Sequence, residues 1–392
     1  MLFSVACILL FGLSFSWVFQ KIHLPGLLGM LLAGIALGPY GLNFLSEDLL
    51  NIGPDLRRIA LVVILFRAGL ALNWEDLKKI GKPAFLLSFV PASCEIIGAT
   101  IFAPRFLNVS ILDAAIIGTV LAAVSPAVIV PRMLCLMEKG YGVKKRIPQM
   151  LLAGSSVDDI YVIVLFSAFI SMAAGQTTQT SSSFLVLIAI ISGIVAGIIL
   201  GWITIRWFQR HHQRDTVKFL ILLSISFLLL SFEEAVPSVP FSGLLAILTI
   251  GMMICGLYPK LAERLSGKFS KAWVAAELLL FVLIGAVVNP DYLFSAGVPI
   301  LAVVFFALLF RLAGVWLSVW KTPLTRKEKI FCGVSYLPKA TVQAAIGAIP
   351  LNMGLQCGET VLTVAVLSIL FTAPLGAVAI DHLHQRLLQK DF

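Results

Sequence analysis

Charged residues are scarce in this sequence. Aspartate, glutamate, lysine and arginine make up 12% of its 392 residues, whereas 59% are hydrophobic and the mean hydropathy is +1.01. Soluble domains carry roughly a quarter charged residues, so this composition excludes a soluble globular protein. Length therefore does not set a domain count, and the relevant unit is the membrane-spanning helix of about 20 apolar residues.

Paired cysteines and a basic leader are also missing. None of the six cysteines belongs to a CxxC pair, and most lie in apolar stretches, so we interpret them as small buried side chains. The first residues, MLFSVACILLFGLSFSW, have no basic region before the apolar run. We therefore expect a first spanning helix that stays in the protein, not a cleaved signal peptide.

What the sequence does have is a series of long apolar stretches. Thirteen are long enough to span a bilayer or nearly so, which predicts an all-α polytopic membrane protein with thirteen transmembrane helices. The predicted helices are centred on residues 2–20, 24–40, 58–73, 83–104, 109–131, 148–173, 183–205, 216–232, 239–258, 273–289, 297–318, 330–353 and 360–380.

Lysine and arginine gather in alternate loops, which predicts an orientation. Of 29 such residues, 23 fall in loops on the side of the C-terminus, and three fall on the other side: Arg57, Arg58 and Arg105. Because basic residues concentrate in cytoplasmic loops, we expect a cytoplasmic C-terminus and, with an odd number of helices, an N-terminus outside. The same bias explains the net charge of +9 without a nucleic-acid partner.

The stretch 183–205 divides the predicted helices into two halves of six. A single linking helix crosses the membrane an odd number of times, so the second half is inverted relative to the first. A single offset of 216 carries Gly69 onto Gly285 and Glu95 onto Arg311. We therefore predict two inverted six-helix repeats, which is the plan of many secondary transporters.

Prolines interrupt the predicted helices 109–131 and 330–353, which hold corresponding places in the two halves. The first contains SPAVIVP, with Ser125 and Pro126, and the second contains LPK, with Pro338. Proline removes a helical donor and frees a carbonyl one turn back, and such breaks survive in a membrane only where they face protein or water. We interpret them as discontinuous helices that mark a midplane ion site, with two packing kinks as the alternative.

Two adjacent aspartates, Asp158 and Asp159, lie inside the predicted helix 148–173. A charge at the bilayer centre costs at least about 2.5 kcal/mol, so intramembrane charges are candidates for function. Neighbouring carboxylates resist ionising together, which suits the exchange of one proton for one cation. Hard cations such as Na⁺ prefer oxygen ligands, and Ser155 shares the face of both aspartates. The alternative is a salt-bridged pair that only holds helices together.

Three further charges are expected inside the bilayer. Lys339 directly follows the second break and is interpreted as the counter-charge of Asp158 when the site is empty. Glu95 and Arg311 occupy equivalent depths in the two halves. We expect them to form a buried structural pair, because arginine cannot give up its charge.

Five motifs along nearly the whole chain carry a resemblance to a known family. They are LPGLLGMLLAGIALGP (24–39), LFRAGL (65–70), VSPAVIVP (124–131), GSSVDD (154–159) and LPKATVQAAIG (337–347). Together they resemble the monovalent cation/proton antiporters, and more closely the NHA-type sodium/proton exchangers of the cation/proton antiporter-2 branch. The last of these motifs is specific to that family.

The resemblance implies a secondary antiporter, not an enzyme, that exchanges Na⁺ or Li⁺ for protons by elevator-like alternating access and serves pH homeostasis. It implies a scaffold and dimerisation part at 1–80 and 210–295, a moving core at 82–175 and 296–385, and a linker helix at 182–206. The discontinuous helices would cross at the ion site. A homodimer in the bacterial cytoplasmic membrane is implied, with membrane lipids as partners and no cofactor besides the transported ions.

The resemblance also assigns roles to single residues. It places the family's essential carboxylate on Asp159, its companion on Asp158, the crossing-helix lysine on Lys339, and the charged pair on Glu95 and Arg311. Many electrogenic relatives carry lysine at the position of that arginine. Because lysine is able to release a proton and arginine is not, we expect electroneutral exchange.

Several alternatives stay open. Potassium/proton exchange or another ion-coupled carrier fits the same features, because selectivity depends on the geometry of the cavity. An ion channel would need a continuous lined pore, and an intramembrane aspartyl protease would need aspartates from separate helices. The sequence also leaves open the partners of Arg67 and Glu277.

Overall fold

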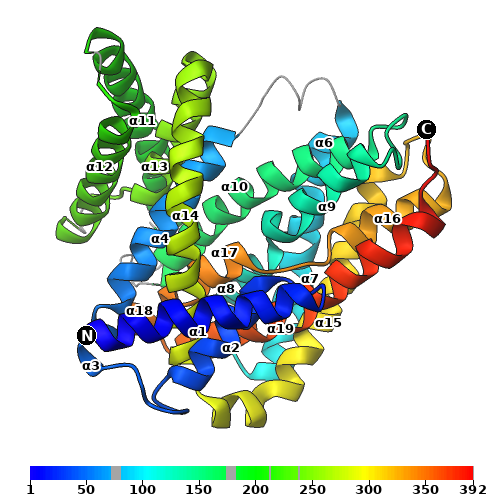
Figure 1. The fold of residues 1–392 in the computed structure, drawn as a ribbon, viewed down its shortest axis with the longest axis horizontal. Coiled ribbons are helices and arrows are strands. Elements are labelled where there is room, and N and C mark those ends of the chain that lie inside the picture. The colour runs from blue at the N-terminus through cyan, green and yellow to red at the C-terminus, as the bar shows by residue number, and fades with distance from the viewer. Residues whose placement is uncertain (72–80, 174–181, 212, 237–238, 392) are drawn as a thin grey trace. The chain divides into compact units, whose positions relative to one another are not determined.

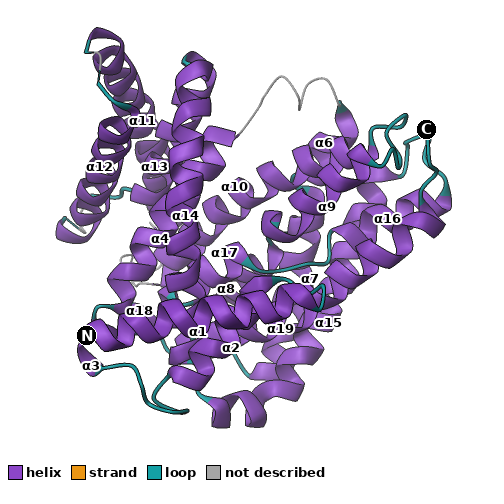
Figure 2. Cartoon of the chain, viewed as in Figure 1, coloured by secondary structure: helices purple, strands orange, loops and turns teal. Residues whose placement is uncertain are grey.

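The protein is helical in the computed structural model, which describes residues 1–71, 81–173, 182–211, 213–236 and 239–391 (Figures 1 and 2). Within these ranges the only strand-like pairing is an isolated bridge between Tyr141 and Lys390. The predicted all-α class is therefore confirmed. The end of the predicted helix 58–73 lies outside the described residues, as do Lys78 and Lys79, two of the lysines used for the orientation.

All thirteen predicted stretches fall on helices. The helices are α1 (Leu2–Lys21), α2 (Gly26–Leu37), α3 (Glu47–Asn51), α4 (Gly53–Ala71), α6 (Lys82–Leu87), α7 (Val90–Leu107), α8 (Ile111–Ala122), α9 (Pro126–Glu138), α10 (Ile147–Ala173), α11 (Ser182–Arg210), α12 (Asp215–Ala235), α13 (Gly243–Leu257), α14 (Pro259–Val287), α15 (Pro290–Val319), α16 (Arg326–Ser335), α17 (Thr341–Gly347), α18 (Ile349–Asn352) and α19 (Gly358–Leu387). In the described part of the chain, nine helical segments are long and apolar enough to cross a membrane, and α2 and α13 are shorter apolar helices. Thirteen crossings stay a prediction.

Local signals in the sequence set several helix ends. The Ser110 hydroxyl accepts the N–H of Asp113 at 3.1 Å and caps the start of α8. Thr325 and Glu328 form a reciprocal capping box at the start of α16. Asn108, with φ of 52°, ends α7 in the left-handed conformation that asparagine tolerates well. Polar side chains at these ends supply partners for backbone groups that have none within the helix.

By its contacts the chain forms two units, and the first comprises Met1–Asp55, Glu75–Val162 and Leu278–Phe392. Here α7 packs against α15 and α8, while α16, α17 and α18 pack against α19. A side chain at Gly314 of α15 would meet the backbone of Pro91 at 2.7 Å, so this glycine allows α15 and α7 to approach closely. This unit contains all the predicted site residues.

The second unit comprises Leu56–Trp74 and Ile163–Glu277. In it α11 packs against α13 at Gly193, where a Cβ would lie 2.5 Å from the carbonyl oxygen of Ser242. Arg67 of α4 lies 5.9 Å from the ring of Trp273 and interacts electrostatically with Glu277. The structure thus gives Arg67 a carboxylate partner within its own unit, which the sequence left open.

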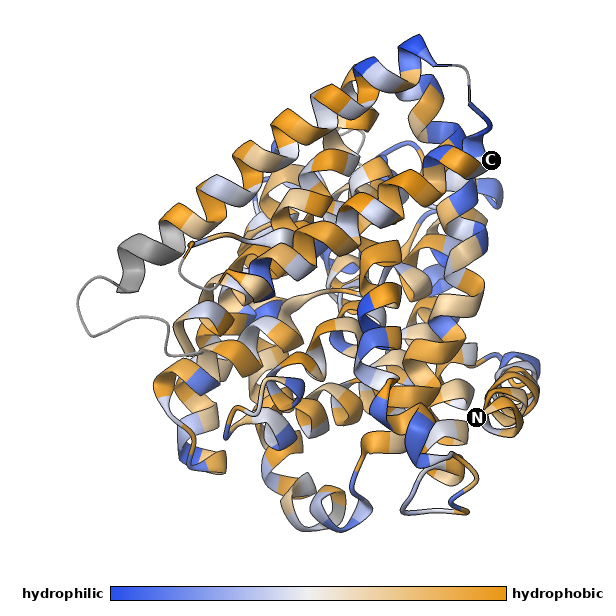
Figure 3. Cartoon of the chain, turned by 90° about the vertical axis from the view of Figure 1, so that its left-hand side faces the viewer, coloured by the Kyte–Doolittle hydropathy of each residue, from blue (hydrophilic) through white to orange (hydrophobic). Residues whose placement is uncertain are grey.

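Hydrophobic residues extend along much of the length of the helices, and hydrophilic residues gather at helix ends and in loops (Figure 3). Large apolar side chains point outward from several helices, including Leu10 and Trp17 of α1 and Leu228 of α12. Soluble proteins rarely expose contiguous apolar surface on this scale. The pattern is typical of helices that face lipid.

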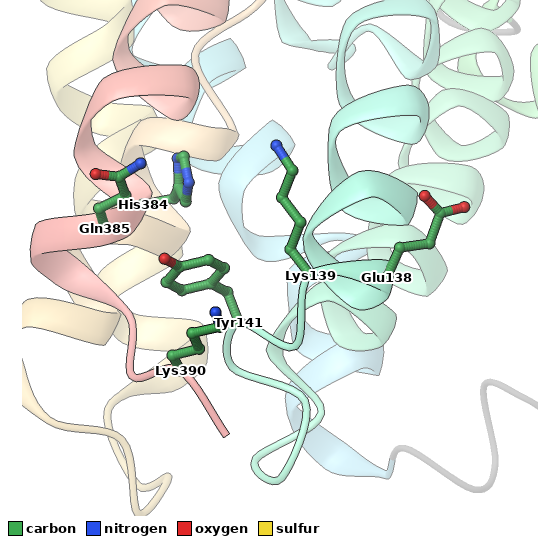
Figure 4. Close-up of a pocket in the computed structure, with 6 residues that line it drawn as sticks. All are labelled: Glu138, Lys139, Tyr141, His384, Gln385 and Lys390. Carbon is green, nitrogen blue, oxygen red and sulfur yellow. The ribbon is translucent and has the colours of Figure 1, made fainter. Parts of the chain in front are cut away.

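The C-terminal residues lie against the loop between α9 and α10. The N–H of Gly142 donates to the carbonyl of Gln389 at 2.9 Å, and the N–H of Asp391 donates to the carbonyl of Gly140 at 2.8 Å. Around them lies an open pocket of about 470 Å³, lined by Glu138, Lys139, Tyr141, His384, Gln385 and Lys390 (Figure 4). These contacts tie the end of the chain to the loop that leads into α10.

Candidate ion-binding site

Two helix breaks meet in the first unit (Figure 1). Helix α8 ends at Ala122 and α9 begins at Pro126, whose ring lacks the N–H that would donate to the Ala122 carbonyl in a continuous helix. The second break separates α16 from α17 and contains Pro338. The N–H of Ser125 donates to the Pro338 carbonyl at 2.9 Å. Both breaks therefore lie at the prolines, and they contact each other directly.

The same unit buries all five predicted intramembrane charges. Glu95, Asp158, Arg311 and Lys339 are fully buried, and Asp159 is 5% exposed. Glu95 comes from α7, the aspartates from α10, Arg311 from α15, and Lys339 from the break between α16 and α17. Side chains that are far apart in the sequence thus meet beside the two breaks.

Arg311 is the centre of this cluster. Its Nη1 donates to Glu95 Oε2 at 2.7 Å, and its Nη2 donates to Asp158 Oδ2 at 2.9 Å. Its Nε donates to the carbonyl of Tyr336 at 2.7 Å, and Nη1 also donates to the carbonyl of Ala122. These two carbonyls lie at the ends of α16 and α8, where the helices break. One guanidinium therefore binds two carboxylates and donates a hydrogen bond to a backbone carbonyl at each break.

Lys339 pairs differently from the expectation. Its Nζ donates to Glu95 Oε2 at 2.6 Å, whereas Arg311 occupies Asp158. The planar fork of arginine spans two carboxylates at once, which a single ammonium group does not do as well. The expected pair of Glu95 and Arg311 is present, but Glu95 shares its Oε2 between both bases. The backbone N–H of Lys339 donates to the Thr372 hydroxyl at 2.9 Å.

The two aspartates have unlike surroundings. Asp158 Oδ2 accepts the N–H of Val124 at 3.0 Å in addition to its bond from Arg311. Asp159 Oδ1 is buried and has no hydrogen-bond partner, and no cationic side chain in the described part of the chain forms an ion pair with this carboxylate. Asp158 is thus held in place, while Asp159 has no ion-pair partner among the described residues.

The charges of the cluster balance without Asp159. Glu95 and Asp158 supply two negative charges, and Arg311 and Lys339 supply two positive charges, all within hydrogen-bond distance of a partner. Burying paired charges is tolerated when their hydrogen bonds are satisfied, whereas an isolated buried charge is very costly. Asp159 is therefore the one carboxyl group of the five charges that has no direct ion pair among the described residues.

Several hydroxyl groups lie close to this arrangement in the sequence. The Ser155 hydroxyl donates to the Leu152 carbonyl at 3.1 Å and so does not bond to either aspartate here. The hydroxyls of Ser125, Thr341 and Tyr336 are buried without a hydrogen-bond partner. The sequence reading gave Ser125 no ligand role and missed Thr341 and Tyr336. The sequence does contain a signal for these residues, because each carries a hydroxyl group and lies within a few positions of a break.

Comparison with known proteins decides the family. The family model described as "Sodium/hydrogen exchanger, transmembrane" matches residues 5–384. The chain belongs to this family. Sodium/hydrogen exchanger 9B2 of Mus musculus is 36% identical over 381 residues, which cover 94% of this chain and 69% of the relative. Sodium/hydrogen exchanger 9B1 of Homo sapiens is 33% identical over 384 residues, which cover 94% and 73%.

The fold of the exchanger agrees with this assignment. It is similar to the structure of the sodium proton antiporter MjNhaP1 from Methanocaldococcus jannaschii, with a TM-score of 0.82 and 21% identity over 97% of each chain. The predicted resemblance to the cation/proton antiporters is confirmed. The exchanger is an integral membrane protein and a cation/proton antiporter, and so a transporter rather than an enzyme.

Proposed function

We propose that this exchanger swaps one Na⁺ or Li⁺ for one proton at Asp159 by alternating access. The observation that carries the proposal is the buried, unpartnered Oδ1 of Asp159 beside a cluster whose other four charges balance. Because an isolated buried carboxylate is costly, Asp159 binds either a proton or a cation. The two ions compete for one group, which is the basis of exchange.

Asp158 serves as the companion ligand in this proposal. Its Oδ2 is engaged by Arg311 and Val124, but its Oδ1 is buried and has no partner. That oxygen is free to bind a cation held by the neighbouring Asp159. Ser155 joins them if its hydroxyl turns from Leu152 toward the site. An all-oxygen set of this kind suits a hard monovalent cation.

Electroneutral exchange follows from the same charges. Arg311 keeps its charge, and in this proposal Lys339, whose Nζ donates to Glu95 at 2.6 Å, stays protonated throughout the cycle. Only Asp159 then changes its occupant, one proton for one cation. We expect flux into proteoliposomes to be the same at zero and at an imposed membrane potential. A flux that rises or falls with the potential would show that a second proton moves.

The decisive experiment measures the dissipation of a pH gradient in proteoliposomes by Na⁺, Li⁺ and K⁺. We expect Asp159→Asn to abolish cation-dependent proton flux, because an amide neither carries the proton nor balances the cation. The matched control is Asp48→Asn, which changes an exposed carboxylate of α3 in the same unit and should leave transport unchanged. Normal transport by Asp159→Asn would rule out the assigned site.

The K⁺ arm and a counterflow measurement test the other candidates. Dissipation by K⁺ alone would favour potassium/proton exchange at the same site. Saturable counterflow of Na⁺ against protons is expected of a carrier, whereas a channel would show none. The relatives described above are named sodium/hydrogen exchangers, which supports the sodium/proton pair.

The proposal includes the predicted topology of thirteen crossings in two inverted repeats. Its support is that α7 and α15, which the offset of 216 relates, pack along each other and join through Glu95 and Arg311. The proposal also includes the scaffold and core parts, an elevator-like motion, contacts with membrane lipids, a homodimer and a cytoplasmic C-terminus. The bacterial cytoplasmic membrane stays a prediction, and the relatives named here are mammalian.

A further inference from the structure

Backbone groups at the two breaks need partners inside the protein, because lipid offers none. Ser125 and Pro338 join the breaks by one backbone hydrogen bond. Arg311 donates a hydrogen bond to the Ala122 carbonyl at the end of α8. Three further groups at the breaks are the carbonyls of Leu121 and Ala123 on one side and the N–H of Ala340 on the other.

Gln343 is the hydrogen-bond partner of all three groups. This residue of α17 is fully buried. Its Nε2 donates to the Ala123 carbonyl at 2.7 Å and to the Leu121 carbonyl at 3.4 Å, and its Oε1 accepts the N–H of Ala340 at 2.8 Å. Carbonyls only accept and an N–H only donates, so the neighbours fix which way the amide points. One side chain thus ties the end of α8 to the start of α17.

The segment that Gln343 holds is also the one that holds the ion site. Ala123 lies between Ala122, which accepts a bond from Arg311, and Val124, whose N–H donates to Asp158. A shift of this segment therefore moves the partners of Arg311 and Asp158 together. The buried, unpartnered hydroxyls of Ser125 and Thr341 lie within a few residues of the same contacts.

We propose that Gln343 is a positioning residue that sets the cation affinity of the exchanger by locking the two breaks together, without touching the cation itself. The inference rests on the proposed exchange at Asp159. Three substitutions each remove part of the contact: ionised glutamate has no donor, asparagine is one methylene shorter, and methionine has neither group. Since buried hydrogen bonds act at the breaks and not in the cation's own shell, their loss should weaken binding without abolishing transport.

The test is a series of Gln343 variants in proteoliposomes, with KM for Na⁺, maximal flux and the pH profile as readouts. We expect Gln343→Met and Gln343→Glu to raise KM for Na⁺ by about tenfold, which is the loss of roughly one buried hydrogen bond. Gln343→Asn should fall between these variants and the native protein. The pH profile should shift with KM, because protons and Na⁺ compete at Asp159.

The matched control is Gln149→Met on α10, because the Oε1 of Gln149 is buried without a hydrogen-bond partner and lies outside both breaks. It should leave KM and the pH profile unchanged. An unchanged KM in the folded Gln343 variants, or a loss of maximal flux at unchanged KM, would overturn the inference. So would failure of all three Gln343 variants to fold when Gln149→Met folds, since Gln343 would then serve folding alone.

Asp159→Asn separates this inference from the proposed function. If Asp159→Asn is inactive while the Gln343 variants behave as the native protein does, the exchange site stands and the positioning role fails. If Asp159→Asn transports normally, the exchange site is wrong. The inference about Gln343 then fails with it, whatever KM the Gln343 variants show.

Discussion

Glu95 is the residue on which the charge balance of the site depends. Its Oε2 accepts hydrogen bonds from both Arg311 and Lys339, at 2.7 and 2.6 Å. Glu95→Gln leaves Lys339 without its carboxylate partner and leaves Arg311 paired with Asp158 alone. Breaking a buried pair by removing one partner costs about 3–5 kcal/mol, so we expect a large fall in the melting temperature of the purified protein.

The double variant Glu95→Gln/Lys339→Met shows whether charge balance is the cause. It removes one acid and one base and leaves Arg311 paired with Asp158. We expect it to be more stable than Glu95→Gln alone, with a coupling energy that a double-mutant cycle measures. Simple addition of the two single effects would mean that Glu95 and Lys339 act independently, contrary to the contact that the structure shows.

At this scale the sequence predicts which residues are buried and the pair of Glu95 with Arg311, but not the remaining pairs. Glu95, Asp158, Arg311 and Lys339 stand out because charges are rare in apolar stretches. The partners of Lys339 and Asp158 depend on where three helices and the break between α16 and α17 bring these side chains, and no spacing along the chain encodes that. The assignment of Lys339 to Asp158 therefore differed from the structure, although the set of residues did not.

Among the helices, α16 depends most visibly on a single carboxylate. Glu328 accepts the N–H of Thr325 at 2.6 Å and both Glu328 oxygens accept bonds from Lys145 Nζ, at 2.9 and 2.8 Å. Burial disfavours the charged form, but the bonds from Lys145 and Thr325 outweigh it and hold the pKa of Glu328 below its usual value. The ionised form therefore stabilises the folded protein.

The sign of the resulting pH dependence follows by linkage. A carboxyl whose pKa is lower in the folded protein adds stability above its unfolded value of about 4.3, and this stability is lost as pH falls through the folded value. We expect Glu328→Gln to lower the melting temperature at pH 7. The difference from the native protein should shrink below about pH 4, and a difference that grows with acid would contradict the assignment.

The helix breaks show how far sequence reasoning reaches at the scale of elements. Proline places both breaks correctly, because the missing N–H of Pro126 leaves the Ala122 carbonyl free wherever the helix lies. The partners of the freed groups could not be placed in this way. Gln343 and Arg311 reach them from other helices, and only the packing of α8, α15 and α17 decides that contact. A polar amide in an apolar helix was the available signal for Gln343.

For the whole molecule, the distribution of basic residues predicts an orientation. In the predicted topology, the loops on one side hold 23 lysines and arginines and those on the other hold three. Moving basic loops across a membrane is disfavoured, so the crowded side is expected to be cytoplasmic. The balanced charges of the site do not contribute to this bias, because they are buried and sum to zero without Asp159.

Single cysteines in a background with the six native cysteines replaced test this orientation. Lys144→Cys lies in the exposed loop after α9, and Arg105→Cys lies exposed near the end of α7. We expect a membrane-impermeant thiol reagent to label Arg105→Cys in intact cells, and Lys144→Cys only after the membrane is permeabilised. The helices α8 and α9 lie between these two positions in the chain and together form one candidate membrane span, so the opposite labelling would invert the predicted orientation of the whole chain.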